Sequence, residues 1–365
     1  MEAEEQAQTP VIAPQQGGLL PPPASGAAVR FTAVAPKPRL GQATELQHTL
    51  LAWYDWHKRD LPWRHSPDPY AVLVSEFMLQ QTQADRVAPR FLAFLEQFPT
   101  LEALATASTA AVLRAWSGLG YNVRALRLQA IAREAVRSYA GRLPAEIDEL
   151  MRLPGVGRYT AAAIASFAYG RQAATVDTNI RRVLRRLFVG VDAVAAAFGD
   201  AKAWQLAADV LPLGRAADWN QALMDVGATI CTARQPACPY CPLEALCQAR
   251  HDQLSGGTPI DTPASAKPGV VSGRQPERFA GSSRYYRGRI VRALTQLEPG
   301  HGVPLARLGQ QIKEDFAGYE TTWLAGVVEG LARDGLVSVQ EADGEVTVSL
   351  PEAGVSDVSP DPNPA

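Results

Sequence analysis

The chain has 365 residues, of which 47% are hydrophobic and 20% are charged, and its formal net charge is −2. This composition is that of a folded globular protein long enough for two domains, and it excludes a collagen-like or wholly disordered chain. No apolar run is long enough to span a bilayer, and the near-neutral charge balance points to no particular partner.

Residues 1–42 are rich in Pro, Gly, Gln and Ala, and this composition predicts a disordered N-terminal tail. The tail begins with acidic residues and lacks the basic-then-apolar pattern of a signal or transit peptide. We therefore expect a cytoplasmic protein in a reducing environment.

The region after the tail has helical periodicity with little strand-like alternation, which predicts a mainly α domain over residues 43–250. Its expected helices cover 44–57, 69–82, 84–97, 100–106, 108–115, 121–138, 146–150, 156–168, 176–188, 200–210 and 216–229.

One carboxylate stands out in the second of these helices, within "SEFMLQQTQ" (75–83). If the helix continues to residue 82, Glu76, Gln80 and Gln83 share one polar stripe while apolar side chains face elsewhere. A carboxyl group in apolar surroundings has a raised pKa, so it can hold a proton near neutral pH and act as a general acid. The alternative is a buried Glu that is paired with a neighbouring Arg.

Residues 111–190 hold thirteen Arg and no Lys against five Asp and Glu, which makes this block a candidate anion-binding surface. Within it, "LPGVG" (153–157) separates two expected helices. Gly155 and Gly157 allow a tight turn, the next helix begins with free N–H groups, and Arg158 adds charge. This pattern indicates a helix-hairpin-helix that binds the DNA backbone; a plain helix–turn–helix connection is the alternative.

Four cysteines lie within seventeen residues, with the spacing C-x6-C-x2-C-x5-C: Cys231, Cys238, Cys241 and Cys247. Four thiolates so close together can wrap one compact centre, and the spacing favours an iron–sulfur cluster of structural or sensing role. Structural zinc and two disulfides are the alternatives. Zinc ligands, however, usually come as two pairs separated by a longer segment, and disulfides need an oxidising setting.

Residues 251–283 are rich in Gly, Pro and Ser, which predicts a linker. The stretch 284–350 then predicts three short helices and a hairpin that turns at Asp343-Gly344. This order suggests a small winged-helix-like α+β domain, followed by a disordered tail at 351–365.

Several strings together resemble the endonuclease III superfamily of base-excision DNA glycosylases. They are "LPGVGRYTAAAI", "VDTNIRRVLRR" (176–186) and the cysteine run. Further strings resemble the MutY family of adenine DNA glycosylases: "WYDWHKRDLPWR" (53–64), "SEFMLQQTQ", "GLGY" (118–121) and "WNQALMDVGATIC" (219–231). The resemblance covers residues 48–250 and implies a two-lobed helix-hairpin-helix glycosylase fold with a [4Fe-4S] cluster.

The resemblance also implies an activity, which is removal of adenine mispaired with 8-oxoguanine or guanine after the base swings out of the duplex. Glu76 matches the general acid that protonates adenine N7, and Asp177 matches the anion that stabilises positive charge on the sugar. Asp177 can at the same time be a helix N-cap. Asn179 matches a residue that steadies the acid. Tyr159 stands where glycosylase-lyases carry a nucleophilic Lys, so we expect a monofunctional enzyme.

By the same resemblance, Arg59, Trp63 and Arg64 form the wall of the adenine pocket, although Trp63 taken alone would more often be a core residue. Gln81 and Tyr121 are wedges that enter the duplex near the opposite base. The matched substrate-binding set is completed by Thr82, Leu119 and Gln221, the last at a position where some members have Glu. The implied partner is double-stranded DNA, bound by a monomer associated with a bacterial nucleoid.

The C-terminal region departs from the usual family pattern, because nothing in 284–350 resembles a MutT-like domain. Recognition of 8-oxoguanine is then expected to depend on Gln81, Thr82 and Leu119. Two rival functions remain, namely a thymine-mismatch glycosylase of the same superfamily and a non-catalytic iron–sulfur protein that binds damaged DNA.

Overall fold

The computed structural model describes residues 40–191, 198–257, 260, 279–342 and 344–352, but not the side chains of residues 40–42. The two predicted tails lie almost entirely outside these residues, as does most of the predicted linker. Among the described residues no helix is long and apolar enough to cross a membrane.

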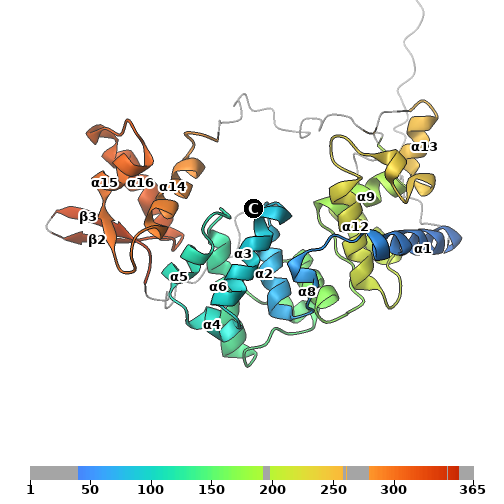
Figure 1. Cartoon of the computed structure of the whole chain (residues 1–365), viewed down its shortest axis with the longest axis horizontal. Coiled ribbons are helices and arrows are strands. Elements are labelled where there is room, and N and C mark those ends of the chain that lie inside the picture. The colour runs from blue at the N-terminus through green and yellow to red at the C-terminus, as the bar shows by residue number, and fades with distance from the viewer. Residues whose placement is uncertain (1–39, 192–197, 258–259, 261–278, 343, 353–365) are drawn as a thin grey trace, which may run out of the picture. The chain divides into compact units, whose positions relative to one another are not determined.

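The main part of the chain is helical, as predicted (Figure 1). Every helix expected from the sequence has a counterpart, and α13 after the last cysteine was not predicted. The helices are α1 Leu40–His57, α2 Pro69–Leu79, α3 Ala84–Gln97, α4 Leu101–Thr106, α5 Thr109–Ala115, α6 Val123–Ser138, α7 Ile147–Leu150, α8 Arg158–Phe167, α9 Thr178–Phe188, α11 Asp200–Asp209, α12 Ala216–Thr229 and α13 Gln248–Leu254.

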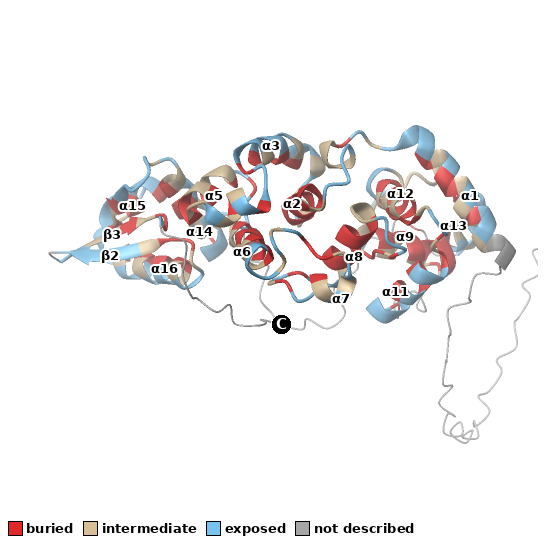
Figure 2. Cartoon of the chain, turned by 90° about the horizontal axis from the view of Figure 1, so that it is seen from below, coloured by how far each residue is buried: buried red, intermediate tan, exposed pale blue. Residues whose placement is uncertain are grey.

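Helix α2 is the buried centre of this region (Figure 2). It begins at Pro69, and the side chain of the N-cap Asp68 accepts hydrogen bonds from the backbone N–H of Tyr70 and of Ala71. Every residue from Tyr70 to Met78 is buried, and the helix packs on α3, α6 and α8. A carboxylate on this helix therefore has few routes to solvent.

The predicted end of this helix was wrong, because α2 stops at Leu79 and not at residue 82. Gln80 leaves the helix with ψ 111°, and Gln81 has φ 56°. A longer helix would need the carbonyls of Phe77 and Met78 for its own N–H groups. Those carbonyls instead accept hydrogen bonds from the Arg124 side chain of α6, so the expected polar stripe does not continue past Glu76.

Two hydrophobic clusters form the core. The first is built mainly from α2 to α8 and the C-terminal elements, and the second from α1, α9, α11 and α12. Helix α8 contributes to both, with Ala161 and Ile164 in the first cluster and Ala162 in the second. Helix α2, which carries Glu76, belongs to the first cluster, and α9, which Asp177 precedes, belongs to the second, in agreement with the predicted two lobes.

The C-terminal region contains α14 Ser283–Thr295, β1 Gly302–Pro304, α15 Leu305–Ile312, α16 Thr321–Arg333, β2 Ser338–Ala342 and β3 Glu345–Ser349. The strands form an antiparallel sheet in the order β1-β3-β2, in which Val348 faces both Val303 and Val339. The predicted three helices and the two paired strands of the hairpin are confirmed, β1 is an additional strand, and Asp343 of the expected turn lies outside the described residues. The expected domain limits, 43–250 and 284–350, stay predictions. The end of the C-terminal region contacts α5, where the backbone N–H of Ala110 donates a hydrogen bond to the carbonyl of Pro351.

Candidate active site

Glu76 is the central group of the site, with only 7% of its surface exposed. Burial raises the pKa of its carboxyl to about 7; the Tyr159 side chain, its hydrogen-bond partner, and the positive charge of Arg64 act in the opposite direction, while the negative charge of Asp177 adds to the rise. The carboxyl is thus half protonated near neutral pH. The alternative of a Glu neutralised by an Arg ion pair is not what the structure shows, since Arg64 is paired elsewhere.

Tyr159 is the second residue of α8 and faces Glu76. Burial raises the pKa of its phenol well above the ordinary value, and the negative charges of Glu76 and Asp177 raise it further. The phenol therefore keeps its proton and can donate it in a hydrogen bond to the Glu76 carboxylate.

Asp177 caps the N-terminus of α9. Its Oδ1 accepts from Ile180 N at 2.6 Å, and its Oδ2 accepts from Asn179 Nδ2 at 3.1 Å. Burial raises the pKa of this carboxyl, and the hydrogen bonds together with the charge of Arg182 offset part of that rise. Asp177 therefore caps α9 and also acts electrostatically on Glu76 and Tyr159. The three predicted groups meet in one site.

Asn179 joins this site to the cysteine loop through Arg182. Arg182 Nη2 donates to Asn179 Oδ1 at 2.7 Å, and Arg182 Nε donates to the carbonyl of Cys231 at 2.8 Å. Helix α12 approaches closely here, because a Cβ on Gly227 would lie 2.7 Å from Asn179 Cβ. A glycine is required at that position for α9 and α12 to pack as they do.

Asp225 on α12 is a site residue that sequence reasoning missed. It is fully buried, and its carboxylate pairs with Arg59 Nε at 2.6 Å and with Arg64 Nη1 at 2.8 Å. Burial alone would raise the pKa of Asp225, but the hydrogen bond from Arg64 and the charges of Arg64 and Arg59 outweigh it and hold the pKa below its usual value. The only sequence signal was that Asp225 is the one acidic residue in "WNQALMDVG" (219–227).

The remaining residues of the expected adenine pocket are Trp63 and Gln221. Trp63 is half-buried and packs edge-on against Phe91, with ring centroids 5.7 Å apart. Gln221 Oε1 accepts a hydrogen bond from the Tyr54 hydroxyl at 2.8 Å. Burial raises the pKa of Tyr54 to about 12, so this hydroxyl remains a donor.

The predicted wedges lie on two loops. Gln81 is exposed with φ 56°, and Tyr121 is 52% exposed with φ 48°. Thr82 is half-buried, and Leu119 is only 4% exposed, so its side chain packs in the first core cluster and does not face solvent.

The glycine hairpin has the predicted geometry. Gly155 has φ 76°, and Gly157 is the N-cap of α8 with no side chain that satisfies the first N–H groups. Arg158 and Arg127 are exposed, and Arg127 lies against Gly155. A helix start with free N–H groups next to arginines is suited to bind an anion.

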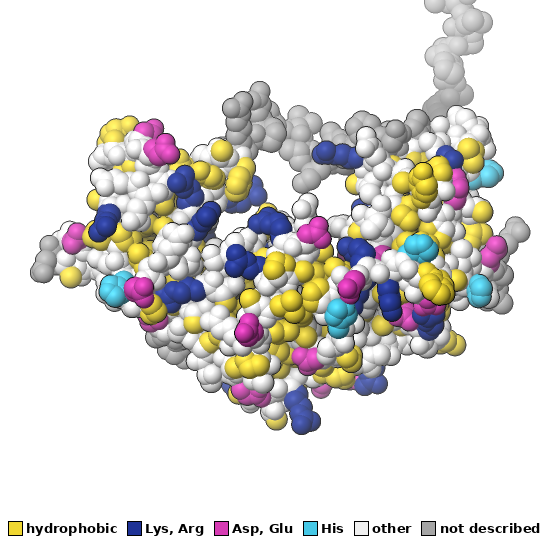
Figure 3. Space-filling model, viewed as in Figure 1, with side chains coloured by type: hydrophobic (Ala, Val, Ile, Leu, Met, Phe, Trp, Pro, Cys, Tyr) yellow, Lys and Arg dark blue, Asp and Glu magenta, His cyan; other side chains and the backbone are white. Residues whose placement is uncertain are grey.

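The arginine excess of residues 111–190 is smaller at the surface than in the sequence. Arg137, Arg171 and Arg181 form ion pairs with acidic residues, while Arg124 and Arg186 are buried. In the view of Figure 3, Lys and Arg side chains are scattered among acidic and hydrophobic ones and do not form one continuous basic face. Phosphate contacts are therefore expected at the hairpin and not over the whole block.

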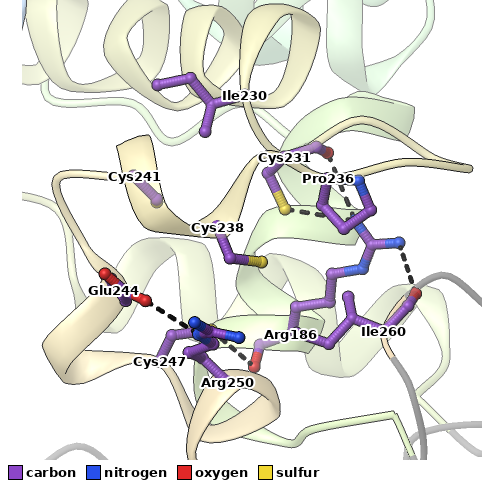
Figure 4. Close-up of a pocket in the computed structure, with 10 residues that line it drawn as sticks. All are labelled: Arg186, Ile230, Cys231, Pro236, Cys238, Cys241, Glu244, Cys247, Arg250 and Ile260. Atoms are coloured by element: carbon purple, nitrogen blue, oxygen red, sulfur yellow. Dashed lines mark hydrogen bonds and ion pairs between the residues drawn. The ribbon is translucent and has the colours of Figure 1, made fainter. Parts of the chain in front are cut away.

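The four cysteines line one pocket that is partly open to solvent (Figure 4). All four are free thiols, and Arg186 Nη1 donates to Cys231 Sγ at 3.3 Å. Among the described residues no three His, Cys, Asp or Glu side chains converge as ligands of a single metal ion. Thiolates around one zinc ion would lie at about 2.3 Å from it and so close to one another, whereas a cluster spaces its ligands more widely.

The chain was compared with known proteins. Residues 74–194 match the model of the "HhH-GPD superfamily base excision DNA repair protein" family. An adenine DNA glycosylase of Mycolicibacterium smegmatis is 39% identical over 307 residues, which is 82% of this chain and 94% of that protein. A human adenine DNA glycosylase is 43% identical over 221 residues, which is 58% of this chain and 40% of that protein.

Among solved structures, a thermostable thymine-DNA glycosylase is similar with a TM-score of 0.54 and 33% sequence identity, covering 58% of this chain and 97% of that one. Its fold agrees with the predicted two-lobed helical architecture. The chain therefore belongs to the adenine DNA glycosylase family within the HhH-GPD superfamily of base excision DNA repair proteins.

Proposed function

We propose that this chain removes adenine that is mispaired with 8-oxoguanine or guanine, by hydrolysing the bond between the base and deoxyribose in double-stranded DNA. The observation that carries the proposal is the pairing of a carboxyl group with a pKa of about 7, Glu76, with a second carboxylate, Asp177, in one buried site. Family membership supplies the substrate class.

In the proposed reaction, adenine leaves the stack and Glu76 transfers its proton to N7 of the base. The C1′–N9 bond then breaks, its electron pair stays with the protonated base, and positive charge develops on the sugar. Asp177 stabilises this charge, and the oxygen of a water molecule adds to C1′ while its proton passes to the Glu76 carboxylate, which restores the acid. The products are adenine and an abasic site in an intact strand.

Tyr159 supports this assignment because its neutral phenol offers no amine for a Schiff base. Its hydrogen bond to Glu76 instead orients the acid. We therefore propose a monofunctional glycosylase, and little strand cleavage should accompany base release.

The pocket for the flipped base is proposed to involve Arg59, Trp63, Arg64 and Gln221. Asp225 holds the two guanidiniums, so their direction is set before a base arrives. Gln81 and Tyr121 are proposed to fill the gap left in the duplex, and the hairpin at Gly155 and Gly157 to bind the DNA backbone.

We also propose that Cys231, Cys238, Cys241 and Cys247 hold a [4Fe-4S] cluster. All four cysteines line one pocket, and their C-x6-C-x2-C-x5-C spacing favours a cluster over zinc. When bound, the cluster would tie the loop 231–247 to α9, where Arg186 contacts Cys231. A broad visible absorption and iron in the purified protein, with no zinc, would test this.

A single-turnover excision assay tests the function with three duplexes, which carry adenine opposite 8-oxoguanine, adenine opposite guanine, and thymine opposite guanine. We expect base release from the first two only. Release of thymine alone would favour a thymine-DNA glycosylase, the activity for which the similar solved structure is named. Binding to the duplexes without release of any base would leave the non-catalytic function.

A further inference from the structure

Two loops carry strained backbone at the surface where the duplex is proposed to bind. One covers residues 80–83 between α2 and α3, and the other covers residues 117–122 between α5 and α6. Gln81 and Tyr121 have φ 56° and 48°, a region that residues other than glycine seldom adopt. Such a strained residue persists only where its surroundings hold it.

Arg124 of α6 lies beneath both loops and is only 5% exposed. On the side of the first loop, its Nη1 donates to the carbonyls of Phe77 at 2.7 Å, Met78 at 3.0 Å and Gln80 at 2.6 Å. These carbonyls belong to the end of α2, the negative end of the helix dipole, where a cation is favourable. Arg124 therefore terminates the helix that carries the acid and begins the first loop.

The same guanidinium reaches the second loop. Its Nη2 donates to the carbonyl of Gly120 at 3.0 Å and to that of Leu119 at 3.4 Å, and also to Thr82 Oγ1 in the first loop at 3.2 Å. Nε donates to the carbonyl of Tyr121 at 3.4 Å. A planar group with donors on three nitrogens makes this possible, whereas the single ammonium of a lysine cannot reach both loops.

The charge of Arg124 is held by carbonyls, a hydroxyl and two aromatic rings. Its guanidinium lies 5.4 Å from the ring centre of Trp116 and 5.6 Å from that of Tyr121. Burial lowers the pKa of Arg124 to about 10, so it remains charged at neutral pH. Removing a hydrogen bond to a charged group is more damaging than removing one between neutral groups.

We propose that Arg124 is a positioning residue that couples the two loops, so that Gln81 and Tyr121 enter the duplex together and distinguish 8-oxoguanine from guanine opposite the adenine. This inference rests on the proposed function and adds a residue that need not touch DNA. It predicts that shortening Arg124 impairs opposite-base discrimination more than it impairs folding.

The test compares Arg124→Lys with Arg133→Lys as the matched control. Arg133 lies on the same helix, is half-buried, and donates from Nε to the carbonyl of Ala105 at 3.2 Å, away from both loops. The first readout is the ratio of single-turnover excision rates for adenine opposite 8-oxoguanine and opposite guanine. We expect Arg124→Lys to lower this ratio about tenfold and Arg133→Lys to leave it unchanged.

The second readout is hydrogen exchange of the backbone amides, which does not depend on activity. Arg124→Lys should speed exchange in 80–83 and 117–122 together, and Arg133→Lys in neither. An unchanged ratio in Arg124→Lys, or an equal fall in both variants, would overturn the proposal. If the unmodified protein released no adenine, the proposed function would fail, whereas exchange would still report whether the loops are coupled.

Thr82→Ala provides a milder variant should Arg124→Lys not fold. It removes one acceptor of Arg124 from the first loop while leaving the second loop's sequence intact. Coupling predicts about fivefold faster exchange in the second loop, at residues 117–122. Faster exchange confined to 80–83 would show that the loops are independent and would overturn the proposal.

Discussion

Glu76 and Asp225 are two buried carboxyl groups in opposite electrostatic environments. Glu76 has a phenol as its hydrogen-bond partner and a second carboxylate nearby, and its pKa rises to about 7. Asp225 is even less exposed, yet Arg59 and Arg64 hold its pKa below the usual value. Burial alone therefore does not identify an acid catalyst; the charges that share the burial decide which carboxyl holds a proton at neutral pH.

The largest expected effect comes from Glu76→Gln. This change removes the transferable proton but keeps the size of the side chain, so excision of adenine should slow by about 10²–10⁴. Affinity for a mispaired duplex should stay within a few-fold, as a filter-binding or anisotropy titration would measure. A variant that retained full excision would remove Glu76 from the chemistry and support a purely binding function.

Asp225→Asn is expected to lower the stability of the protein, because it leaves two arginines without their buried anion. Breaking a buried ion pair costs about 3–5 kcal/mol, so the free energy of unfolding in urea should fall by that amount. Asp218→Asn is the control, because Asp218 pairs with Arg215 at the surface, where such a loss costs about 1 kcal/mol or less. Equal losses in the two variants would contradict the structural contrast.

The pH dependence of stability should have opposite signs for the two groups. The folded-state pKa of Glu76 is raised from 4.5 to about 7, so its favourable contribution is complete below pH 4.5 and is lost as pH rises through 7. Glu76→Gln should thus be more stable than the unmodified protein at pH 8, by roughly 3 kcal/mol, and similar to it near pH 4. Asp225, with a lowered pKa, contributes above its unfolded pKa and loses that contribution as pH falls.

The last expected effect is on the pH dependence of the excision rate. With an acid of pKa about 7, the single-turnover rate should be level at low pH and fall about tenfold per pH unit above 7. Asp225→Asn should shift this profile little if enough of it remains folded to be assayed. A profile that stayed flat to pH 9 would mean that a different group supplies the proton.

The sequence predicted the local features well. The helix-forming segments, the glycine hairpin and the cysteine spacing are encoded within short stretches, and the groups Glu76, Tyr159 and Asp177 stood in recognisable strings. The structure brings them together, since Tyr159 is hydrogen-bonded to Glu76 and the charge of Asp177 acts on both.

The features that sequence reasoning missed depend on contacts between distant positions. Arg64 and Asp225 are 161 positions apart, and Arg124 is 47 positions from Phe77. A helical sequence pattern cannot reveal that the Arg124 side chain from α6 terminates α2 by binding its last carbonyls. Nor can it reveal that Arg64, which was expected to contact adenine, is paired with Asp225. Arg124 was among the arginines of the expected anion-binding surface of residues 111–190, because Arg is usually exposed.

Helix α8 has a consequence for how a duplex must be accommodated. Since Ala161 packs in one hydrophobic cluster and Ala162 in the other, the helix cannot follow one lobe without disturbing the interior of the second. A duplex bound without a change in this packing would itself have to bend to fit the protein. A mispair that is easily kinked would be engaged faster than a well-stacked pair, so mechanical compliance of the DNA becomes part of what is recognised.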